Sequence, residues 1–412
     1  MKRNSYIFHN KVSRCSGCGA CVQICKHGAI KMRADGEGFL YPSLDESKCI
    51  ECGLCEKVCP YNIETANEER GKCYIAATKS EAYYKESATI GICTMLADYI
   101  ISIKGVVFGV YLDETSWDAY HVQVRDWIGV RKIRNSKYIQ SDTRNTFYEA
   151  KAYLEKGTIV LYIGTPCEIA GLKSFLRKNY RNLYTIDLMC HGTFSHKLMT
   201  FEVEYWQSLF SGKIRNFRFR SKRKYILNNG GMVNFDVVVN GKKKHIERFA
   251  GSSPTYKCYA YSGDGLSYNL RPACYSCVFK DKNRYGDITV GDPWGVCKDL
   301  ITDVRIKKAI VRSLYFANTA KGDELLNKIS HLLIYQEISR DESFKQGALL
   351  PISLTMPPLR AKLLGCSTME EYVSVIEQHF KCNLEQEHAF FDKRYKRQYI
   401  KCLVKKILHL NR

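Results

Sequence analysis

Eight cysteines between residues 15 and 59 constrain this chain more than any other feature. They form two runs with the same spacing, Cys-x-x-Cys-x-x-Cys-x-x-x-Cys. Three close thiolates can bind one face of a 4Fe-4S cluster while the fourth comes from elsewhere, so each run can supply the other's fourth ligand. The spacing therefore predicts two clusters, one on Cys15, Cys18, Cys21 and Cys59, and one on Cys49, Cys52, Cys55 and Cys25.

This spacing is typical of bacterial ferredoxins, with one departure. Lys26 follows Cys25, whereas Pro60 follows Cys59. Proline here fixes the turn and donates no ligand, so the prediction stands. Structural zinc is an alternative, but a zinc site is closed by four ligands, and no histidine accompanies the eight cysteines. A disulfide framework needs an oxidising compartment, and the first five residues contain no apolar stretch that would export the chain.

Length and charge limit the class of protein. At 412 residues the chain exceeds a ferredoxin and leaves room for about two further domains or one large one. Its 63 lysines and arginines exceed its 42 acidic residues, which gives a net charge of +21. This charge favours an acidic surface, an anionic substrate or nucleic acid as partner, and the alternative is a lysine bias without a specific partner.

Two features bear on the compartment. Asp98 and Lys104 interrupt the longest apolar stretch, residues 90–111, so the sequence has no run long enough to span a bilayer. The 19 cysteines favour a reducing, oxygen-poor environment. We therefore expect a cytoplasmic protein that is soluble or peripheral to the membrane.

The chain divides into three predicted parts. Residues 1–70 are predicted to form an α+β, ferredoxin-like domain, and residues 71–350 an α/β core with a mostly parallel sheet. Residues 351–412 are predicted to be a helical, basic tail. Within the first part we expect a strand near 6–8, a helix over 21–25, a hairpin over 29–41, a helix on the second cysteine run and a charged connector over 64–72.

Apolar runs and helical periodicity define the core. Helices are predicted over 92–103, 143–155 and 168–178, and strands over 106–111, 119–125, 159–163, 183–188 and 233–239. Two predicted strands lead directly into Gly164-Thr165-Pro166-Cys167 and Cys190-His191-Gly192. Ligands gather at the carboxyl ends of parallel strands, so both cysteines are expected at one ligand-binding edge.

A basic section follows the core strands. It contains Arg215, Arg218, Arg220, Lys222, Arg223, Lys224, Lys242, Lys243 and Lys244. Phe217 and Phe219 lie among these cations, as in some nucleic-acid-binding proteins, but no helix-turn-helix, zinc-finger or RNA-binding signature is present. Solvated hairpin ends are the favoured interpretation.

Further motifs stand in order behind the cysteine runs. They are Gly164-Thr165-Pro166-Cys167, Cys190-His191-Gly192, Cys274-x-x-Cys277 and Gly286-Asp287-Ile288-Thr289-Val290-Gly291-Asp292-x-Trp294-Gly295. Over most of residues 1–300 the chain thereby resembles the beta-subunit family of coenzyme F-420 hydrogenases and dehydrogenases. The resemblance implies iron-sulfur clusters and usually FAD, a redox partner protein, and a deazaflavin or another small acceptor. Ferredoxin-fused bacterial relatives often occur among polysaccharide-biosynthesis genes.

The resemblance also implies a flavin site. Asn135-Ser136-Lys137-Tyr138 is similar to a Gly-Ser-Lys-Tyr element of relatives and offers a hydroxyl, a cation and a ring to a phosphorylated cofactor. We expect the flavin near Gly91, Ser136, Lys137, Tyr138 and Thr165. The chain departs from many relatives at Ser87-Ala88-Thr89-Ile90-Gly91, where they have Ser-Gly-Gly, and at Pro293, where they have an aromatic residue.

A third 4Fe-4S cluster is predicted on Cys167, Cys190, Cys274 and Cys277, each of which lies in one of these motifs. Zinc bound by the same four thiolates is the alternative, although zinc cannot relay electrons. Arg271 and Arg284 flank the Cys-x-x-Cys pair and are expected to offset the cluster's negative charge.

Three functions fit the sequence. The first is an iron-sulfur, flavin-dependent oxidoreductase that exchanges electrons with a small anionic or deazaflavin-like acceptor. The second is an electron-transfer adaptor for a separate catalytic protein, and the third is a basic binding protein with structural clusters. No catalytic residue can be assigned, because no Ser-His-Asp set appears and His191 can equally support Cys190. The remaining cysteines are interpreted as structural thiols, namely Cys73, Cys93, Cys258, Cys297, Cys366, Cys382 and Cys402.

The last residues form an amphipathic helical pattern. From Phe391 onward, apolar residues recur every three or four positions opposite lysines and arginines. Such a helix can lie on an anionic membrane surface or dock on the protein itself. Equal sedimentation with anionic vesicles before and after truncation at Phe391 would exclude the membrane role.

Overall fold

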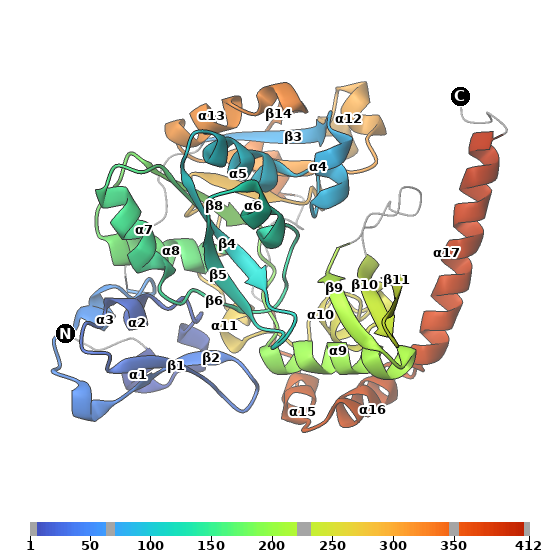
Figure 1. The fold of residues 1–412 in the computed structure, drawn as a ribbon, viewed down its shortest axis with the longest axis horizontal. Coiled ribbons are helices and arrows are strands. Elements are labelled where there is room, and N and C mark those ends of the chain that lie inside the picture. The colour runs from blue at the N-terminus through green and yellow to red at the C-terminus, as the bar shows by residue number, and fades with distance from the viewer. Residues whose placement is uncertain (1–5, 63–70, 221–231, 346–353, 408–412) are drawn as a thin grey trace.

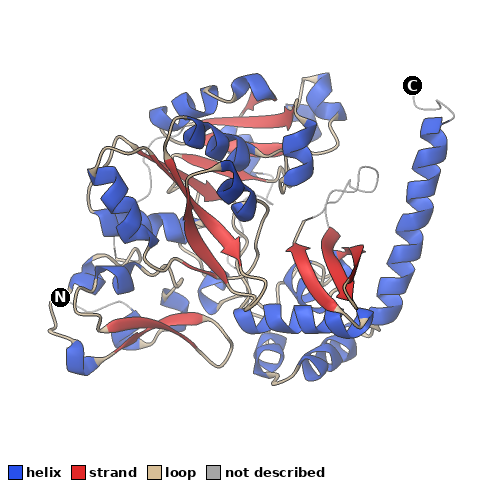
Figure 2. Ribbon diagram, viewed as in Figure 1, coloured by secondary structure: helices blue, strands red, loops and turns tan. Residues whose placement is uncertain are grey.

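The computed structural model describes residues 6–62, 71–220, 232–345 and 354–407. Figure 1 shows four parts: an N-terminal module, a large sheet flanked by helices, a smaller sheet with its own helices, and a long terminal helix. Figure 2 shows helices flanking the large sheet, with the hairpin of the N-terminal module below it.

The N-terminal module contains the two cysteine runs. Its elements are α1 (Tyr6–His9), α2 (Ala20–Ile24), β1 (Ile30–Ala34), β2 (Leu40–Leu44) and α3 (Leu54–Lys57). The predicted hairpin and both predicted helices are confirmed. Gly19 and Gly53, with φ of 77° and 70°, precede α2 and α3, so each half starts its helix in the same way. The predicted strand over 6–8 is wrong, because these residues form α1 and Tyr6 stacks on Tyr41 with ring centroids 4.8 Å apart.

The core is a nine-stranded sheet. Its strands are β3 (Lys72–Thr78), β4 (Val106–Leu112), β5 (Ala119–Val124), β6 (Ser141–Asp142), β7 (Val160–Gly164), β8 (Leu183–Leu188), β12 (Ile288–Gly291), β13 (Ser313–Ala317) and β14 (Leu333–Ile338). Their order is β14-β3-β13-β12-β8-β7-β4-β5-β6. The predicted parallel pairing holds for β12, β8, β7 and β4 and for β5 with β6. The remaining neighbours pair antiparallel, so the sheet is mixed.

Helices cover both faces of this sheet. They include α4 (Glu81–Glu86), α5 (Ile92–Ser102), α6 (Trp127–Ile133), α7 (Thr146–Glu155), α8 (Pro166–Leu176), α12 (Val304–Lys308), α13 (Ala320–Asn327) and α14 (Arg340–Lys345). Side chains of α5 and α13 share one buried cluster, and side chains of α7 and α8 share another. Cys18, Ala20 and Val58 join the second cluster, so the N-terminal module packs against the face that α7 and α8 cover.

The contact between the module and the core is close. A Cβ at Gly171 of α8 would lie 2.9 Å from Cys18 Sγ, so only glycine fits there without displacement. Gln140 accepts the Leu40 N-H at 2.9 Å, and the Thr143 hydroxyl donates to the Cys18 carbonyl at 2.9 Å. These bonds fix the cysteine runs against the strand ends of the core. Lys72, predicted in the connector, instead begins β3, and residues 63–70 lie outside the described residues.

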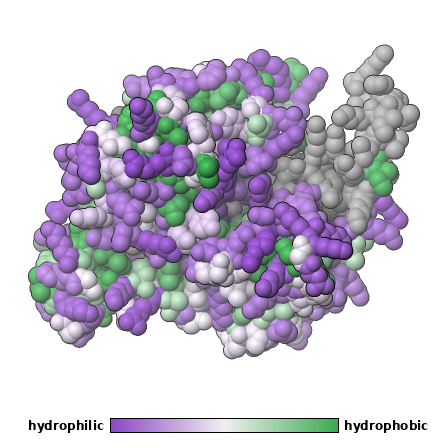
Figure 3. All heavy atoms as spheres, in the orientation of Figure 1, coloured by the Kyte–Doolittle hydropathy of each residue, from purple (hydrophilic) through white to green (hydrophobic). Residues whose placement is uncertain are grey.

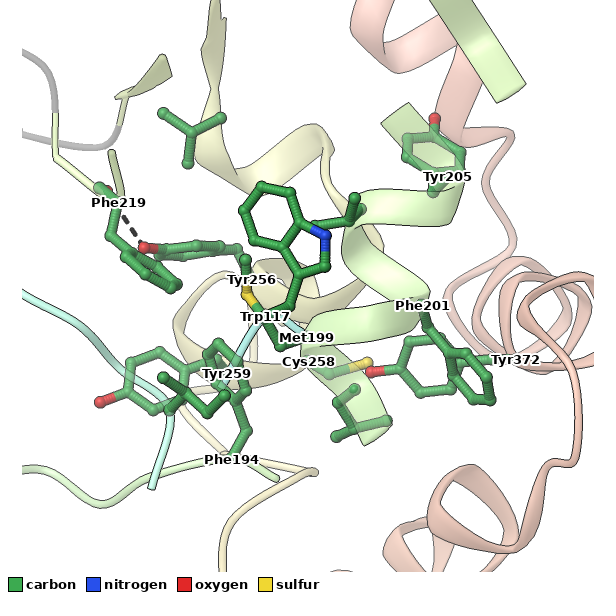
Figure 4. Packing of buried hydrophobic residues seen from close by; sticks show 14 of the residues in the cluster. Trp117, Phe194, Met199, Phe201, Tyr205, Phe219, Tyr256, Cys258, Tyr259 and Tyr372 are labelled. Carbon is green, nitrogen blue, oxygen red and sulfur yellow. Dashed lines mark hydrogen bonds between the residues drawn. The ribbon is translucent and has the colours of Figure 1, made fainter. Parts of the chain in front are cut away.

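A second sheet and a helical layer form the other half of the molecule. They comprise α9 (His196–Phe210), β9 (Lys213–Arg218), β10 (Met232–Val239), β11 (Lys242–Phe249), α10 (Pro254–Ala260), α11 (Pro272–Tyr275), α15 (Leu359–Gly365), α16 (Met369–Phe380) and α17 (Leu384–Ile407). Figure 4 shows the aromatic packing between them, in which the Tyr256 hydroxyl donates to the Phe219 carbonyl at 3.0 Å. Lys242, Lys243 and Lys244 are exposed beside the β10–β11 turn, whereas Lys222, Arg223 and Lys224 lie outside the described residues.

Only part of the predicted tail, residues 351–412, lies apart from the core. Leu363, Leu364, Tyr372 and Ile376 of α15 and α16 are buried in the same core cluster as α9. In contrast, α17 contacts β11 near its start and then extends away from the body (Figure 1). Among the described residues, no helix is both long and apolar enough to cross a membrane. The face in Figure 3 is mostly hydrophilic and carries scattered hydrophobic patches.

Candidate functional site

The eight cysteines of the N-terminal module line two cavities. The first cysteine cavity is lined by Cys15, Cys18, Cys21 and Cys59, with Cys55 at its edge. The second cysteine cavity is lined by Cys25, Cys49, Cys52 and Cys55. The fold therefore places the last cysteine of each run beside the first three of the other, which is the grouping that the spacing predicts.

Buried polar groups around the first cysteine cavity lack hydrogen-bond partners within the described residues. They are Arg14 Nε, Ser16 Oγ, Tyr41 Oη, Tyr61 Oη and Arg271 Nη1. Buried donors are normally hydrogen bonded, so this concentration of exceptions indicates a missing acceptor. Sulfur atoms of an iron-sulfur cluster accept such bonds, and the cavity therefore fits this group.

A third cysteine cavity lies at the carboxyl ends of the parallel strands. Cys167 follows β7, Cys190 follows β8, and Cys274 and Cys277 come from α11 and the turn after it. All four line this cavity. The fold thus brings together the four cysteines predicted to bind a third group, although the first and the last of them, Cys167 and Cys277, are 110 positions apart along the chain.

Burial disfavours thiolates at these positions in the protein alone. It raises the pKa of the Cys18 thiol to about 12 and that of Cys59 to about 11. In the third cysteine cavity, burial raises the pKa of Cys190 to about 12 and that of Cys277 to about 11. A metal's positive charge stabilises a buried thiolate, so ligation of iron would reverse this preference.

The described residues contain no preformed site for a single metal ion. Across the part of the chain that the structure describes, no three His, Cys, Asp or Glu side chains converge closely enough to hold one metal ion. A zinc site requires four ligands at about 2.3 Å from a single point. Four cysteines around one cavity are a ligand set that either a 4Fe-4S cluster or a zinc ion accepts.

Arg284 does not lie where the sequence suggested. Its guanidinium lies 3.3 Å from the Asp187 carboxylate and donates to the Leu188 carbonyl at 3.0 Å. Arg284 and Asp187 are both buried, so the positive charge is compensated inside the core. The expectation that Arg284 offsets a charge at the third cysteine cavity is therefore wrong. Arg271 instead reaches Cys15 of the first cysteine cavity, where its Nη2 lies 3.7 Å from Sγ.

A large, mainly apolar cavity adjoins the third cysteine cavity. It measures about 250 Å³ and reaches the surface at Trp294, which is 47% exposed. All five residues predicted for flavin binding line it, namely Gly91, Ser136, Lys137, Tyr138 and Thr165. Its volume is several times that of one water molecule, so it can hold part of an organic ligand.

Two helix starts shape the wall of this large cavity. Gly91 precedes α5 with φ of 95°, and a Cβ there would lie 3.0 Å from Cβ of Tyr83. This single glycine completes the turn although Ala88 and Thr89 stand where relatives have glycine. Opposite, Thr165 and Glu168 form a capping box that starts α8, with the Thr165 N-H donating to Glu168 at 2.7 Å.

The two arginines that line the large cavity are each paired with a carboxylate. Arg220 pairs with Asp292 at 2.6 Å and Arg134 lies 3.7 Å from Asp98. Lys137 has no carboxylate partner among the described residues, and its ammonium donates to the carbonyls of Ile133 at 2.9 Å and Arg134 at 2.7 Å. Burial, aided by the positive charge of Arg218, lowers the pKa of Lys137 to about 7. An anionic ligand group would complete this charge arrangement.

Shared lining residues connect the four cavities in a row. Cys55 lines both the second and the first cysteine cavity. Ser16 and Tyr61 line both the first and the third. Thr165 and Cys190 line both the third cysteine cavity and the large cavity. Only one layer of side chains therefore separates each cavity from the next.

Other predicted residues have varied positions. His191 lines the large cavity, and burial lowers the pKa of its imidazole. Cys73, Cys258 and Cys366 are buried as expected, whereas Cys93 lines the large cavity. Cys297 and Cys382 are partly buried, and the Cys402 side chain lies outside the described residues.

The ion pair between Arg134 and Asp98 was not predicted from the sequence, because no local motif marks a pair formed between two helical segments.

Two protein families match stretches of the chain. Residues 157–340 match the family described as the C terminus of the beta subunit of coenzyme F-420 hydrogenase/dehydrogenase. Residues 14–63 match the 4Fe-4S dicluster domain. No curated protein matches the chain. The predicted resemblance is confirmed for these two stretches.

One solved structure is similar in fold. It is a chain of the F-420-reducing NiFe hydrogenase complex from Methanosarcina barkeri, studied by xenon derivatization. The similarity covers 69% of this chain and 90% of that chain, with 18% sequence identity and a TM-score of 0.42.

Proposed function

We propose that this chain is an iron-sulfur flavoprotein oxidoreductase. The premise is that residues 157–340 match the C terminus of the beta subunit of coenzyme F-420 hydrogenase/dehydrogenase and that residues 14–63 match the 4Fe-4S dicluster domain. The chain passes electrons between a redox partner protein and a small anionic or deazaflavin-like acceptor. The row of connected cavities supports this proposal more than any other observation, because it leads from the N-terminal module to a ligand-sized cavity in the core.

Twelve cysteines would hold three 4Fe-4S clusters. The first and second cysteine cavities supply eight ligands, and Cys167, Cys190, Cys274 and Cys277 supply four. When bound, such clusters supply one-electron carriers, and a flavin can exchange electrons singly or in pairs. Tyr61 and Ser16 form the shared wall between the first and third sites, which keeps water out of the space between them.

The large cavity would bind FAD and position it for an acceptor. Ser136 and Thr165 offer hydroxyl groups, Lys137 offers a cation, and Tyr138 offers a ring. Arg134 and Arg220 line the same wall, paired with Asp98 and Asp292, and their remaining N-H groups can donate to the phosphates of the cofactor or to an anionic acceptor. His191, kept neutral by burial, can hold a hydrogen bond to a ligand without adding charge.

An electron-transfer adaptor without its own substrate site is the alternative. The large cavity favours the oxidoreductase, because an adaptor needs no ligand-sized cavity beside its last redox site. Anaerobically reconstituted protein should bind about one FAD per chain with a Kd of about 1 μM or tighter, measured by its visible spectrum and by quenching of flavin fluorescence. Full iron content without flavin binding would favour the adaptor.

Lys137 makes flavin binding depend on pH. Its pKa of about 7 means that the ammonium loses its proton as the pH rises through neutrality, so an anionic ligand loses its cation. The Kd for FAD should be nearly constant below about pH 6 and rise by up to about tenfold per unit above about pH 7. Lys137→Gln should weaken binding about tenfold at pH 6 and remove this dependence.

Lys132→Gln is the matched control, because Lys132 is exposed on α6 and does not line the large cavity. Its pH profile should equal that of the wild type. A wild-type profile that is flat between pH 6 and pH 9 would contradict the assigned role of Lys137.

A further inference from the structure

Arg271 lies between the two halves of the molecule as a buried, uncompensated cation. Its exposed fraction is 1%, and among the described residues it forms no ion pair with a carboxylate. Its Nε donates to the Cys15 carbonyl at 2.8 Å, and its Nη2 lies 3.7 Å from Cys15 Sγ. The guanidinium also stacks on Tyr41, with its carbon 3.9 Å from the ring centroid. It is therefore held in place by contacts that do not neutralise it.

The backbone of Arg271 lies next to a cysteine of the third cysteine cavity. It precedes α11, and its carbonyl accepts the Cys274 N-H at 2.9 Å. One residue thus contributes its main chain beside the third site and its charge beside the first. Nη1 has no hydrogen-bond partner within the described residues, and it lies 3.2 Å from where a Cβ of Gly17 would stand. The Nη1 N-H group of Arg271 can therefore donate a hydrogen bond to a group bound by the first cysteine run.

We propose that Arg271 is a positioning and tuning residue that raises the reduction potential of the group bound at Cys15, Cys18, Cys21 and Cys59. This inference rests on the proposed function. Each electron added to an iron-sulfur cluster adds a negative charge, which a nearby fixed cation stabilises. The stabilisation is large because the guanidinium is buried and no carboxylate or bulk water screens it.

Arg360 serves as a comparison for a purely structural role of Arg271. This residue is 4% exposed, its Nε donates to the Leu270 carbonyl at 2.7 Å, and it binds Glu37 of the N-terminal module. Arg360 therefore links the same loop to the same module without contacting a cysteine. Its charge is compensated by Glu37, which makes it a matched control.

The test is an anaerobic redox titration followed by electron paramagnetic resonance, with iron analysis of each protein. In Arg271→Gln, one reduction step should shift so that the reduced-to-oxidised ratio at fixed potential falls at least tenfold, which is about 59 mV for a one-electron couple. Arg271→Lys keeps a cation and should restore most of the wild-type potential. Arg360→Gln should shift no step by more than about twofold in this ratio, or about 18 mV.

The outcomes decide the role of Arg271. Full iron content with an unshifted Arg271→Gln titration would overturn the proposal, as would an equal shift in Arg271→Lys. If Arg271→Gln loses iron, the titration of Arg271→Lys tests the proposal instead. A wild-type reduction potential in Arg271→Lys would support the effect of the positive charge, and a lowered reduction potential would contradict it. If wild-type protein holds only about 8 irons, the third cluster of the proposed function fails, while the shift at the first site remains measurable.

Discussion

The double variant Cys274→Ser, Cys277→Ser is expected to lower the iron content of the fully loaded protein from about 12 to about 8 atoms per chain. Both cysteines line the third cysteine cavity, and neither lines the first or second. The clusters of the N-terminal module should therefore persist in the visible and electron paramagnetic resonance spectra. Reduction of bound FAD by a reduced partner ferredoxin should slow by at least about tenfold, because the shortest connection to the large cavity is lost.

Cys297→Ser is the control for this variant. Cys297 lies near the same motifs, but its thiol contacts Asp299 and lines none of the four cavities. Its iron content and flavin reduction should match the wild type. Recovery of about 8 irons and one zinc from fully loaded wild-type protein would contradict the third cluster and favour the adaptor function.

Replacing Asp187 by leucine should destabilise the fold by about 3–5 kcal/mol, because it leaves the Arg284 charge buried without its partner. Asp187 on β8 also accepts the N-H groups of Tyr285 at 3.0 Å and Gly286 at 3.1 Å. Its carboxylate is buried on the strand that leads to Cys190. The free energy of unfolding, measured by urea denaturation under anaerobic conditions, checks this expectation.

Two further variants test how much of the stability loss in Asp187→Leu comes from the unpaired Arg284 charge. Asp187→Asn retains one acceptor oxygen and should lose less stability than Asp187→Leu. Asp303→Leu removes a partly exposed aspartate that caps α12 and should cost about 1 kcal/mol. Equal losses for Asp187→Leu and Asp303→Leu would show that the Arg284 pair contributes little.

The sequence predicted the sites better than it predicted the sheet. The cysteine spacing specified which residues gather, because ligand geometry acts over a few residues and is visible in the chain itself. Continuous apolar runs likewise located β4, β7 and β8 to within one or two residues. The strands β3, β13 and β14 were not predicted, and they pair with one another antiparallel. Their pairing joins residues about 240 positions apart, which local periodicity does not record.

The partners of the buried arginines could not be predicted from the sequence either. Arg271 and Arg284 stand near the same Cys-x-x-Cys pair, and nothing in their neighbours separates them. The fold directs one guanidinium to Asp187 and the other to Cys15. Side-chain direction at long range depends on packing that only the assembled structure defines. The short helix α1 was predicted as a strand, because the β propensity of Tyr6 to Phe8 is only a weak local preference that tertiary context can override.

The position of β3 has a consequence for synthesis of the chain. This first core strand lies between β13 and β14, so neither of its neighbours exists until residues 313–338 have left the ribosome. At the usual rate of translation, β3 waits roughly 12 to 47 s for the first of them. The two N-terminal cysteine runs are complete long before that, whereas the third set of cysteines closes only after residue 277. Metal loading of the module can therefore begin on a nascent chain whose core is still open, and the edges of β3 remain unpaired until its neighbours have been made, for longer the slower the elongation.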